Sequence, residues 1–184
     1  MGTPMTALTP ELQAFIEHQH VFFVASAPSG PGGHVNLSPK GLDTFRVLSP
    51  AQVAYLDITG SGNETAAHVA QNGRLTFMFC AFDGKPRILR LFGTGRVVLP
   101  TDPQFNQLAP RFPALPGIRQ IILMDISRVK SSCGFGLPLM TFTGDRTEMP
   151  TWALDKGEPG LAEYRMKNNR TSLDGLPAPG MGEP

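Results

Sequence analysis

The chain has 184 residues and a formal net charge of +1, and 41% of its residues are hydrophobic against 17% that are charged. This balance excludes an intrinsically disordered chain and predicts one globular domain with a sizeable core. The sixteen lysines and arginines form no dense basic run, so the sequence offers no nucleic-acid-binding footprint.

The sequence shows no targeting or membrane segment. The N-terminal residues lack the basic-then-apolar order of a secretory signal peptide, and no apolar run approaches the roughly 18 residues of a membrane helix. Cys80 and Cys133 do not form a C-x-x-C pair, and Cys80 lies in an apolar strand pattern typical of a buried, inert thiol. We therefore expect a cytoplasmic protein without membrane partners.

The first third of the chain predicts one helix followed by strands. Thr9 and Pro10 are typical of a helix N-cap and a first helical position, so we expect a helix over residues 11–19. Aromatic and β-branched residues then predict four strands, of which the first two form a hairpin across a glycine- and proline-rich turn. These strands cover residues 21–27, 34–39, 45–48 and 52–58.

A second helix is predicted over residues 64–72, with Asn63 or Ser61 as its N-cap and Gly73 ending it in the left-handed conformation. Long strands separated by one short helix follow, and Gly93 and Gly95 suit a bend or a bulge in the second of them. The strands cover residues 74–82, 87–99 and 119–130, and the helix covers residues 102–112.

The C-terminal part predicts two helices, over residues 150–156 and 159–169, and a tail from residue 174 that is too rich in proline and glycine to order itself. The chain thus has six or seven strands and a few short helices, without regular strand–helix alternation. That pattern argues against a parallel doubly wound sheet. It favours a mostly β fold of the β+α type, a six- or seven-stranded antiparallel barrel with peripheral short helices.

Familiar enzyme motifs are absent or incomplete. The stretch "GSGNET" at 60–65 lacks the third glycine of a dinucleotide fingerprint and the lysine of a Walker loop. The S-x-x-K match at 127–130 falls in a strand pattern without its companion motifs. His18 and His20 stand two apart on a predicted helix and face different directions, so no metal site is predicted.

One set of polar residues surrounds two predicted turns. Asn36, Ser38 and Lys40 alternate and share one face if the strand persists, although Pro39 indicates an edge or an end. The helix that starts near Asn63 offers free N–H groups and a positive dipole end. Together these groups could receive a phosphate, with Lys40 as counter-charge. The alternative is a plain helix cap beside a surface turn, with nothing bound.

Two charged residues leave questions open. The Glu64 carboxylate opposes a phosphate unless it points away or contacts a neutral ligand group. Arg90 lies between Leu89 and Leu91, and an arginine with an apolar flank needs a partner. That partner is a ligand anion, a flavin carbonyl, or an aspartate of another strand or subunit.

The order of three segments resembles the pyridoxamine 5′-phosphate oxidase-like family of FMN-binding split barrels. The segments are "HVNLSPKG", "YLDITGSGNETAAHVAQNGRLTFMF" and "ILRLFGTGRVV", and the resemblance covers roughly residues 12–130. The family often has arginine-lysine where this chain has Glu64-Thr65, and the arginine-rich C-terminal motif of the vitamin B6 enzymes is missing. The C-terminal sequence instead looks like that of a bacterial branch of the family.

The resemblance implies an FMN-binding split-barrel domain over residues 1–146, and a helical extension with a flexible tail over residues 147–184. It also implies a homodimer with each FMN in the groove between subunits. Lys40 would supply positive charge to the phosphate or to the substrate side, and either Lys40 or Arg90 would lie near the pyrimidine edge of the flavin. The cofactor-binding residues carried over from the family are Val35, Asn36, Leu37, Ser38, Lys40, Thr59, Gly62, Asn63, Glu64 and Thr65.

The function expected from this resemblance is that of an FMN-dependent oxidoreductase acting on a small molecule. Three alternatives stay open: a flavin carrier or sensor without turnover, a barrel whose groove serves only dimerisation, and cofactor F420 in place of FMN. The segment 133–138 is expected to be a flap that stacks Phe135 on the flavin, or a tight turn with Phe135 in the core. No catalytic side chain or substrate is predicted.

Overall fold

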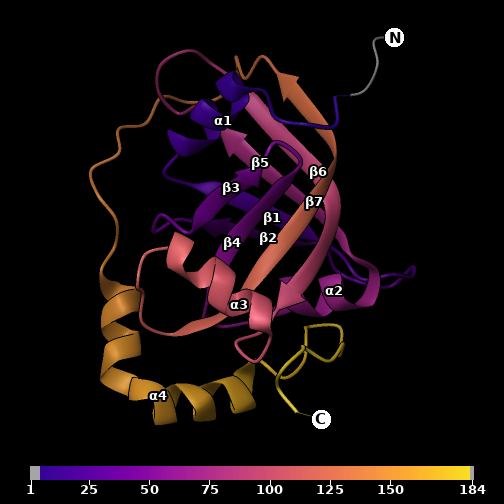
Figure 1. Cartoon of the computed structure of the whole chain (residues 1–184), viewed down its shortest axis with the longest axis vertical. Helices are drawn as coiled ribbons and strands as arrows, with labels where there is room; N and C mark the ends of the chain where they lie inside the picture. The colour runs from indigo at the N-terminus through magenta and orange to yellow at the C-terminus, as the bar shows by residue number, and fades with distance from the viewer. Residues whose placement is uncertain (1–4, 183–184) are drawn as a thin grey trace.

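Seven antiparallel strands form one curled sheet in the computed structural model, which describes residues 5–182 (Figure 1). The strand order β2-β1-β5-β6-β7-β4-β3 confirms the predicted antiparallel split barrel. The strands are β1 (Phe22–Ser26), β2 (Asn36–Lys40), β3 (Phe45–Ser49), β4 (Gln52–Ile58), β5 (Arg74–Cys80), β6 (Ile88–Val98) and β7 (Ile118–Ser132).

The two ends of the sheet lie close together because the chain joins them directly. β2 and β3 are the opposite edges of the hydrogen-bonded order, yet residues 41–44 connect them, a length that spans at most about 14 Å. In this turn Leu42 and Asp43 adopt left-handed φ angles of 59° and 54°, which non-glycine residues rarely adopt. The sheet therefore curls into a barrel that stays open between β2 and β3. Pro39 lies on an edge strand, one of the two predicted positions.

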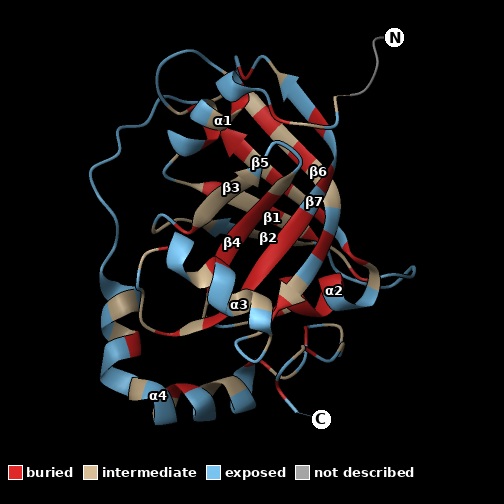
Figure 2. Ribbon diagram, viewed as in Figure 1, coloured by how far each residue is buried: buried red, intermediate tan, exposed pale blue. Residues whose placement is uncertain are grey.

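The concave side of the sheet holds the main core. Phe22, Phe45, Tyr55, Phe77 and Phe79 form a cluster of edge-to-face and stacked rings there. Figure 2 shows the central strands buried along most of their length. Cys80 is buried as predicted, and burial raises the pKa of its thiol.

The described residues form four α-helices and one 3-10 helix around the sheet, and the helices that pack on the sheet bury apolar residues against it. Two predicted features are confirmed: Oγ1 of Thr9 accepts a hydrogen bond from the Leu12 amide, and Gly73 ends the second helix with a φ of 69°. Within residues 5–182, no helix combines the length and the apolar character needed to span a membrane. The helices are α1 (Pro10–Glu17), α2 (Glu64–Asn72), α3 (Pro103–Leu108), η1 (Ala109–Arg111) and α4 (Glu148–Asn168).

The C-terminal part departs from the sequence prediction in one respect. α4 is kinked at Gly157, which matches the two predicted helices. The tail after it is packed, because Ala178 and Met181 are buried against Ala67 of α2, whereas its composition predicted an unordered segment. Glycines in positive φ let the tail turn back on itself and form internal backbone hydrogen bonds. Residues 183 and 184 lie outside the described part.

Candidate functional site

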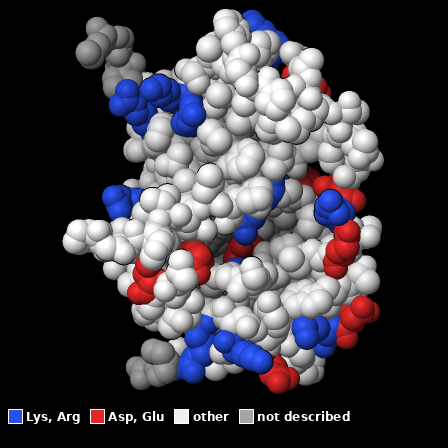
Figure 3. Space-filling model, turned by 180° about the vertical axis from the view of Figure 1, so that it is seen from behind, with Lys and Arg blue, Asp and Glu red and all other residues white. Residues whose placement is uncertain are grey.

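Seven of the residues predicted from the sequence line one cavity of about 340 Å³. The cavity lies between β2, the end of β4 and the loop that precedes α2. On the face that carries β2, Figure 3 shows positive and negative side chains meeting around a hollow near the middle of the molecule. The seven residues are Asn36, Ser38, Lys40, Gly62, Asn63, Glu64 and Thr65.

The polar face of β2 is held in place by side-chain hydrogen bonds. Nδ2 of Asn36 donates to Thr65 Oγ1 at 3.1 Å and to Ser26 Oγ at 3.2 Å, and the Ser38 hydroxyl donates to Asn36 Oδ1 at 3.0 Å. Ser26 Oγ in turn lies 3.1 Å from Nδ1 of the buried His68. Burial lowers the pKa of His68 against the opposing charge of Glu64, so this imidazole is neutral at pH 7. β2 is thereby fastened to α2.

The N-terminus of α2 faces the cavity without a side-chain cap. Asn63 makes no cap hydrogen bond, because its Oδ1 accepts from Gln120 Nε2 at 2.8 Å instead. The first N–H groups of a helix have no partner within the helix and carry the positive end of its dipole. Glu64 lines the cavity too, and one of its carboxylate oxygens, Oε2, accepts from the Leu173 amide at 2.9 Å. The cavity therefore presents open donors of the kind that bind anions.

A buried group of charges forms the floor of the cavity. Asp57 and the side chain of Arg119 are 2% and 3% exposed and pair at 2.8 Å, and Lys40 Nζ lies 3.3 Å from the other carboxylate oxygen. Burial acts to raise the pKa of Asp57, but the charges of Arg119 and Lys40 outweigh it and hold the pKa below its usual value. Asp57 is therefore ionised at neutral pH, and Arg119 is largely neutralised by it. Lys40, with 28% of its side chain exposed, remains the accessible cation of the floor.

Four of the predicted residues do not line this cavity in a single chain. Val35 and Leu37 are 75% and 61% exposed, and Leu37 lies on the opposite face of β2 from Asn36 and Ser38. Thr59 is buried and its hydroxyl donates to the Gly117 carbonyl. Arg90 lies on β6, where Nη1 donates to Ser132 Oγ at 3.4 Å. Val35 and Leu37 are thus exposed on the surface of the chain.

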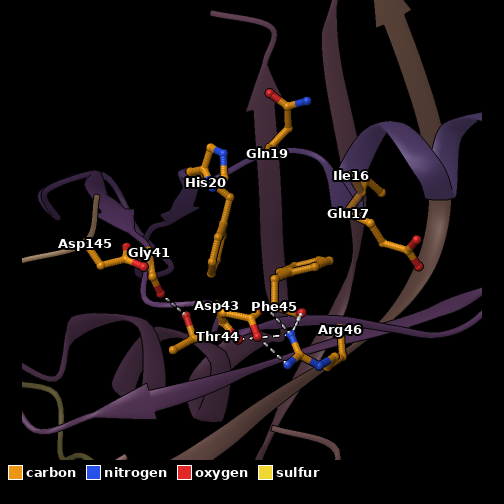
Figure 4. A pocket seen from close by; sticks show the side chains of 11 residues that line it. Ile16, Glu17, Gln19, His20, Gly41, Asp43, Thr44, Phe45, Arg46 and Asp145 are labelled. Carbon is orange, nitrogen blue, oxygen red and sulfur yellow. Dashed lines mark hydrogen bonds and ion pairs between the residues drawn. The ribbon is translucent and has the colours of Figure 1, made fainter. Parts of the chain in front are cut away.

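A second cavity, of about 450 Å³, lies beside the turn between β2 and β3 (Figure 4). None of the residues predicted for the site lines it. Its arginine is already paired, because Arg46 donates to both carboxylate oxygens of Asp43 at 2.7 and 2.8 Å. In the same region the Thr44 hydroxyl donates to the Gly41 carbonyl. The hydrogen bonds of Arg46 and Thr44 therefore stabilise the turn, and these side chains are not open donors for a ligand.

The predicted flap at 133–138 is a tight turn in which the Leu137 amide donates to the Gly134 carbonyl. Phe135 is 81% exposed, so the alternative that placed it in the core is wrong. Gly134 has a φ of 70°, and a Cβ there would meet the Arg87 backbone at 2.8 Å, so the turn requires glycine at this position. Stacking of Phe135 on a flavin stays a prediction.

The fold and the cavity define an open antiparallel barrel with a polar pocket suited to an anionic ligand. Residues 8–133 match the sequence model of the pyridoxamine 5′-phosphate oxidase family. The pyridoxamine 5′-phosphate oxidase family protein ustO of Aspergillus flavus is 45% identical over 190 residues, which cover 93% of this chain and 75% of ustO. The chain therefore belongs to the pyridoxamine 5′-phosphate oxidase family. The bacterial branch expected from the C-terminal sequence stays a prediction.

Solved structures share the fold at low sequence identity. HupZ of Group A Streptococcus has a TM-score of 0.54 at 16% identity, over 73% of this chain and 99% of HupZ. The FAD binding protein of Mycobacterium smegmatis has a TM-score of 0.50 at 16% identity, over 70% of this chain and 97% of that protein. These similarities support the split barrel that the strand order defines.

Proposed function

We propose that this protein binds FMN in the cavity between β2 and α2 and uses it as an oxidoreductase. The observation that carries the proposal is the meeting of Lys40 with the uncapped N-terminus of α2 in one cavity. Membership of the family and the shared fold with an FAD binding protein support the choice of a flavin. The donor set fits the phosphate end of FMN, because helix N–H groups and a lysine are its usual partners.

Each residue of the site has a role in binding or orienting the cofactor. The N–H groups at the start of α2 and the Lys40 ammonium would hold the phosphate, and Asn36 and Ser38 would meet the ribityl hydroxyls or the ring edge. Bound FMN would supply the hydride or electron transfer, while the protein positions it and sets its electrostatics. Asp57 would hold Lys40 in place, and the negative charge of its carboxylate would reduce the net positive charge that this pair presents to the phosphate.

We propose that the functional unit is a homodimer with the flavin ring in the groove between subunits. Exposed apolar side chains at the start of the edge strand β2, and others in the segment after β7, support this assembly, because exposed apolar surface often marks a protein–protein interface. They are Val35, Leu37, Phe135, Leu139 and Met140.

The test of flavin binding is a titration of the purified protein with FMN, followed by absorption and fluorescence, for the wild type and for Lys40→Ala. We expect Lys40→Ala to weaken FMN binding at least about tenfold, because a charge-assisted bond to the phosphate is lost. Riboflavin, which has no phosphate, should change by about twofold or less. Lys85→Ala, at an exposed position outside the cavity, is the matched control. A wild-type protein that leaves the FMN spectrum unperturbed would contradict the proposal.

Substitution of Glu64 should change affinity in the opposite direction. Glu64→Gln removes a negative charge at the start of α2 and keeps an oxygen that can accept from the Leu173 amide. We expect FMN to bind about threefold to tenfold more tightly and riboflavin to bind unchanged, because only the phosphate repels the carboxylate. The same titration measures both ligands, and an equal gain for the two would show that Glu64 does not face the phosphate.

A further inference from the structure

The C-terminal extension lies outside the part of the chain that matches the family model, yet it contacts the candidate site. The match ends at residue 133, whereas α4 and the tail follow from residue 148 onwards. Figure 1 shows the tail beside α2, and the burial of Met181 and Ala178 against Ala67 agrees. The extension is therefore placed to act on the loop that leads into α2.

Asn169, which follows α4, is the centre of this contact and is fully buried. Its Oδ1 accepts from Arg119 Nη1 at 2.7 Å, and its Nδ2 donates to the Gly60 carbonyl at 3.0 Å. Its main-chain carbonyl accepts a longer bond of 3.5 Å from Asn63 Nδ2. One asparagine thus links the floor of the cavity, the loop and the first residue before α2.

Neighbouring contacts fasten the same loop at its two ends. Nε of Arg165 donates to Thr59 Oγ1 at 2.8 Å, and the Leu173 amide donates to Glu64 at 2.9 Å. Between these points Arg119 Nη1 also donates to the Gly62 carbonyl at 3.0 Å. The loop sequence Gly60-Ser61-Gly62 has few side chains of its own with which to fix its backbone, and glycine gains the most freedom when it is released.

We propose that Asn169 is a positioning residue of the phosphate site, which holds residues 60–63 so that the N–H groups of α2 point into the cavity. A loop that is ordered before the ligand arrives loses less conformational freedom on binding. This inference rests on the flavin binding proposed above. It assigns to the extension a part in building the cofactor site that the barrel alone does not supply.

The test compares Asn169→Ala with Asn168→Ala, a neighbouring control whose exposed side chain donates only within α4, to the Tyr164 carbonyl. Two quantities are measured: FMN and riboflavin dissociation constants, and amide hydrogen exchange of residues 60–65 in the ligand-free protein. We expect Asn169→Ala to weaken FMN about tenfold and riboflavin much less, and to raise loop exchange about tenfold. Asn168→Ala should match the wild type. A merely structural role would lower the melting temperature without changing the ratio of FMN to riboflavin affinity.

Asn169→Asp provides a second variant of nearly the same volume should the alanine variant fold poorly. It keeps an oxygen for Arg119 and removes the donor to Gly60, so we expect faster loop exchange and weaker FMN binding. The proposal is overturned if folded Asn169 variants match Asn168→Ala in both loop exchange and the affinity ratio. A wild-type protein that binds no flavin would refute the proposed function, and loop exchange would still decide whether Asn169 holds the loop.

Discussion

Replacing Arg119 by methionine should destabilise the protein by about 3–5 kcal/mol, the largest effect we expect from a substitution at the site. Asp57 is 2% exposed, and Arg119 meets it through Nη2 at 2.8 Å and through Nε at 3.1 Å. Removing the guanidinium leaves a buried carboxylate with Lys40, at 3.3 Å, as its remaining cation. The variant also loses the hydrogen bonds to Gly62 and Asn169. The free energy of unfolding in urea measures the loss.

The double variant Asp57→Asn/Arg119→Met distinguishes two causes of the destabilisation: the unpaired charge of Asp57 and the lost hydrogen bonds of Arg119. Because it removes both charges of the buried Asp57–Arg119 pair, we expect it to recover about half of the stability that Arg119→Met loses. If the two variants are equally unstable, the uncompensated charge of Asp57 is not the cause.

The same pair of variants gives a pH test with a definite sign. In the wild type the pKa of Asp57 is held below its usual value of about 3.8. The ionised carboxylate therefore stabilises the folded protein at neutral pH, and this stabilisation is lost only as the pH falls through the lowered pKa. In Arg119→Met the effect of burial is no longer offset by the guanidinium, so the pKa of Asp57 should rise. The loss of folding stability caused by the buried carboxylate should then be largest at neutral pH and should decrease on acidification. The stability gap between Arg119→Met and the double variant should therefore narrow between pH 7 and pH 5. A gap that stays constant over this range would contradict the assignment.

Local sequence patterns predict the two elements, β2 and α2, that contribute the polar residues predicted for the site. The alternation of Asn36, Ser38 and Lys40 placed three polar groups on one face of β2, and the limits of α2 followed from Asn63 and Gly73. Caps and strand alternation are local properties, so they can be recognised without knowing what packs against them. Residues of both elements line one cavity.

The sequence does not predict the buried charges at the floor of the cavity, because their proximity depends on which strands pair. Asp57 of β4 faces Gln120 of β7 in the sheet register, and that pairing brings Arg119 beside it. A signal was present, since an aspartate inside "YLDI" and an arginine before "IILM" are charges in apolar strands, which need partners. The apolar flank of Arg90 predicts a partner in the same way, but Arg90 lies on the other face of β6 from Leu89 and Leu91 and donates to Ser132. Asn169 carried no comparable signal, because only the packing of the tail shows its role.

Substituting Gly93 by alanine should destabilise the barrel by about 3 kcal/mol, because the sheet bends at this glycine. The pairing of β6 with β7 shifts register between Phe92 and Gly93. A Cβ at Gly93 would overlap the carbonyl oxygen of Asp125, and a backbone atom in a sheet cannot move aside without disturbing the strand pairing. The register shift of this long strand pair contributes to the curl that brings β2 and β3 together.

Gly95→Ala is the matched comparison on the same strand. Its Cβ would meet the Leu75 and Val69 side chains at 2.9 and 3.2 Å, and these methyl groups can shift, so we expect a loss of about 1 kcal/mol. Neither glycine has a φ in the left-handed region, so the two variants differ in contact and not in backbone preference. Urea unfolding of both variants measures the difference. Equal losses would mean that the β7 backbone at Asp125 can shift to accept the added methyl group. The curl of the sheet would then not depend on the close approach of β6 to β7 at Gly93.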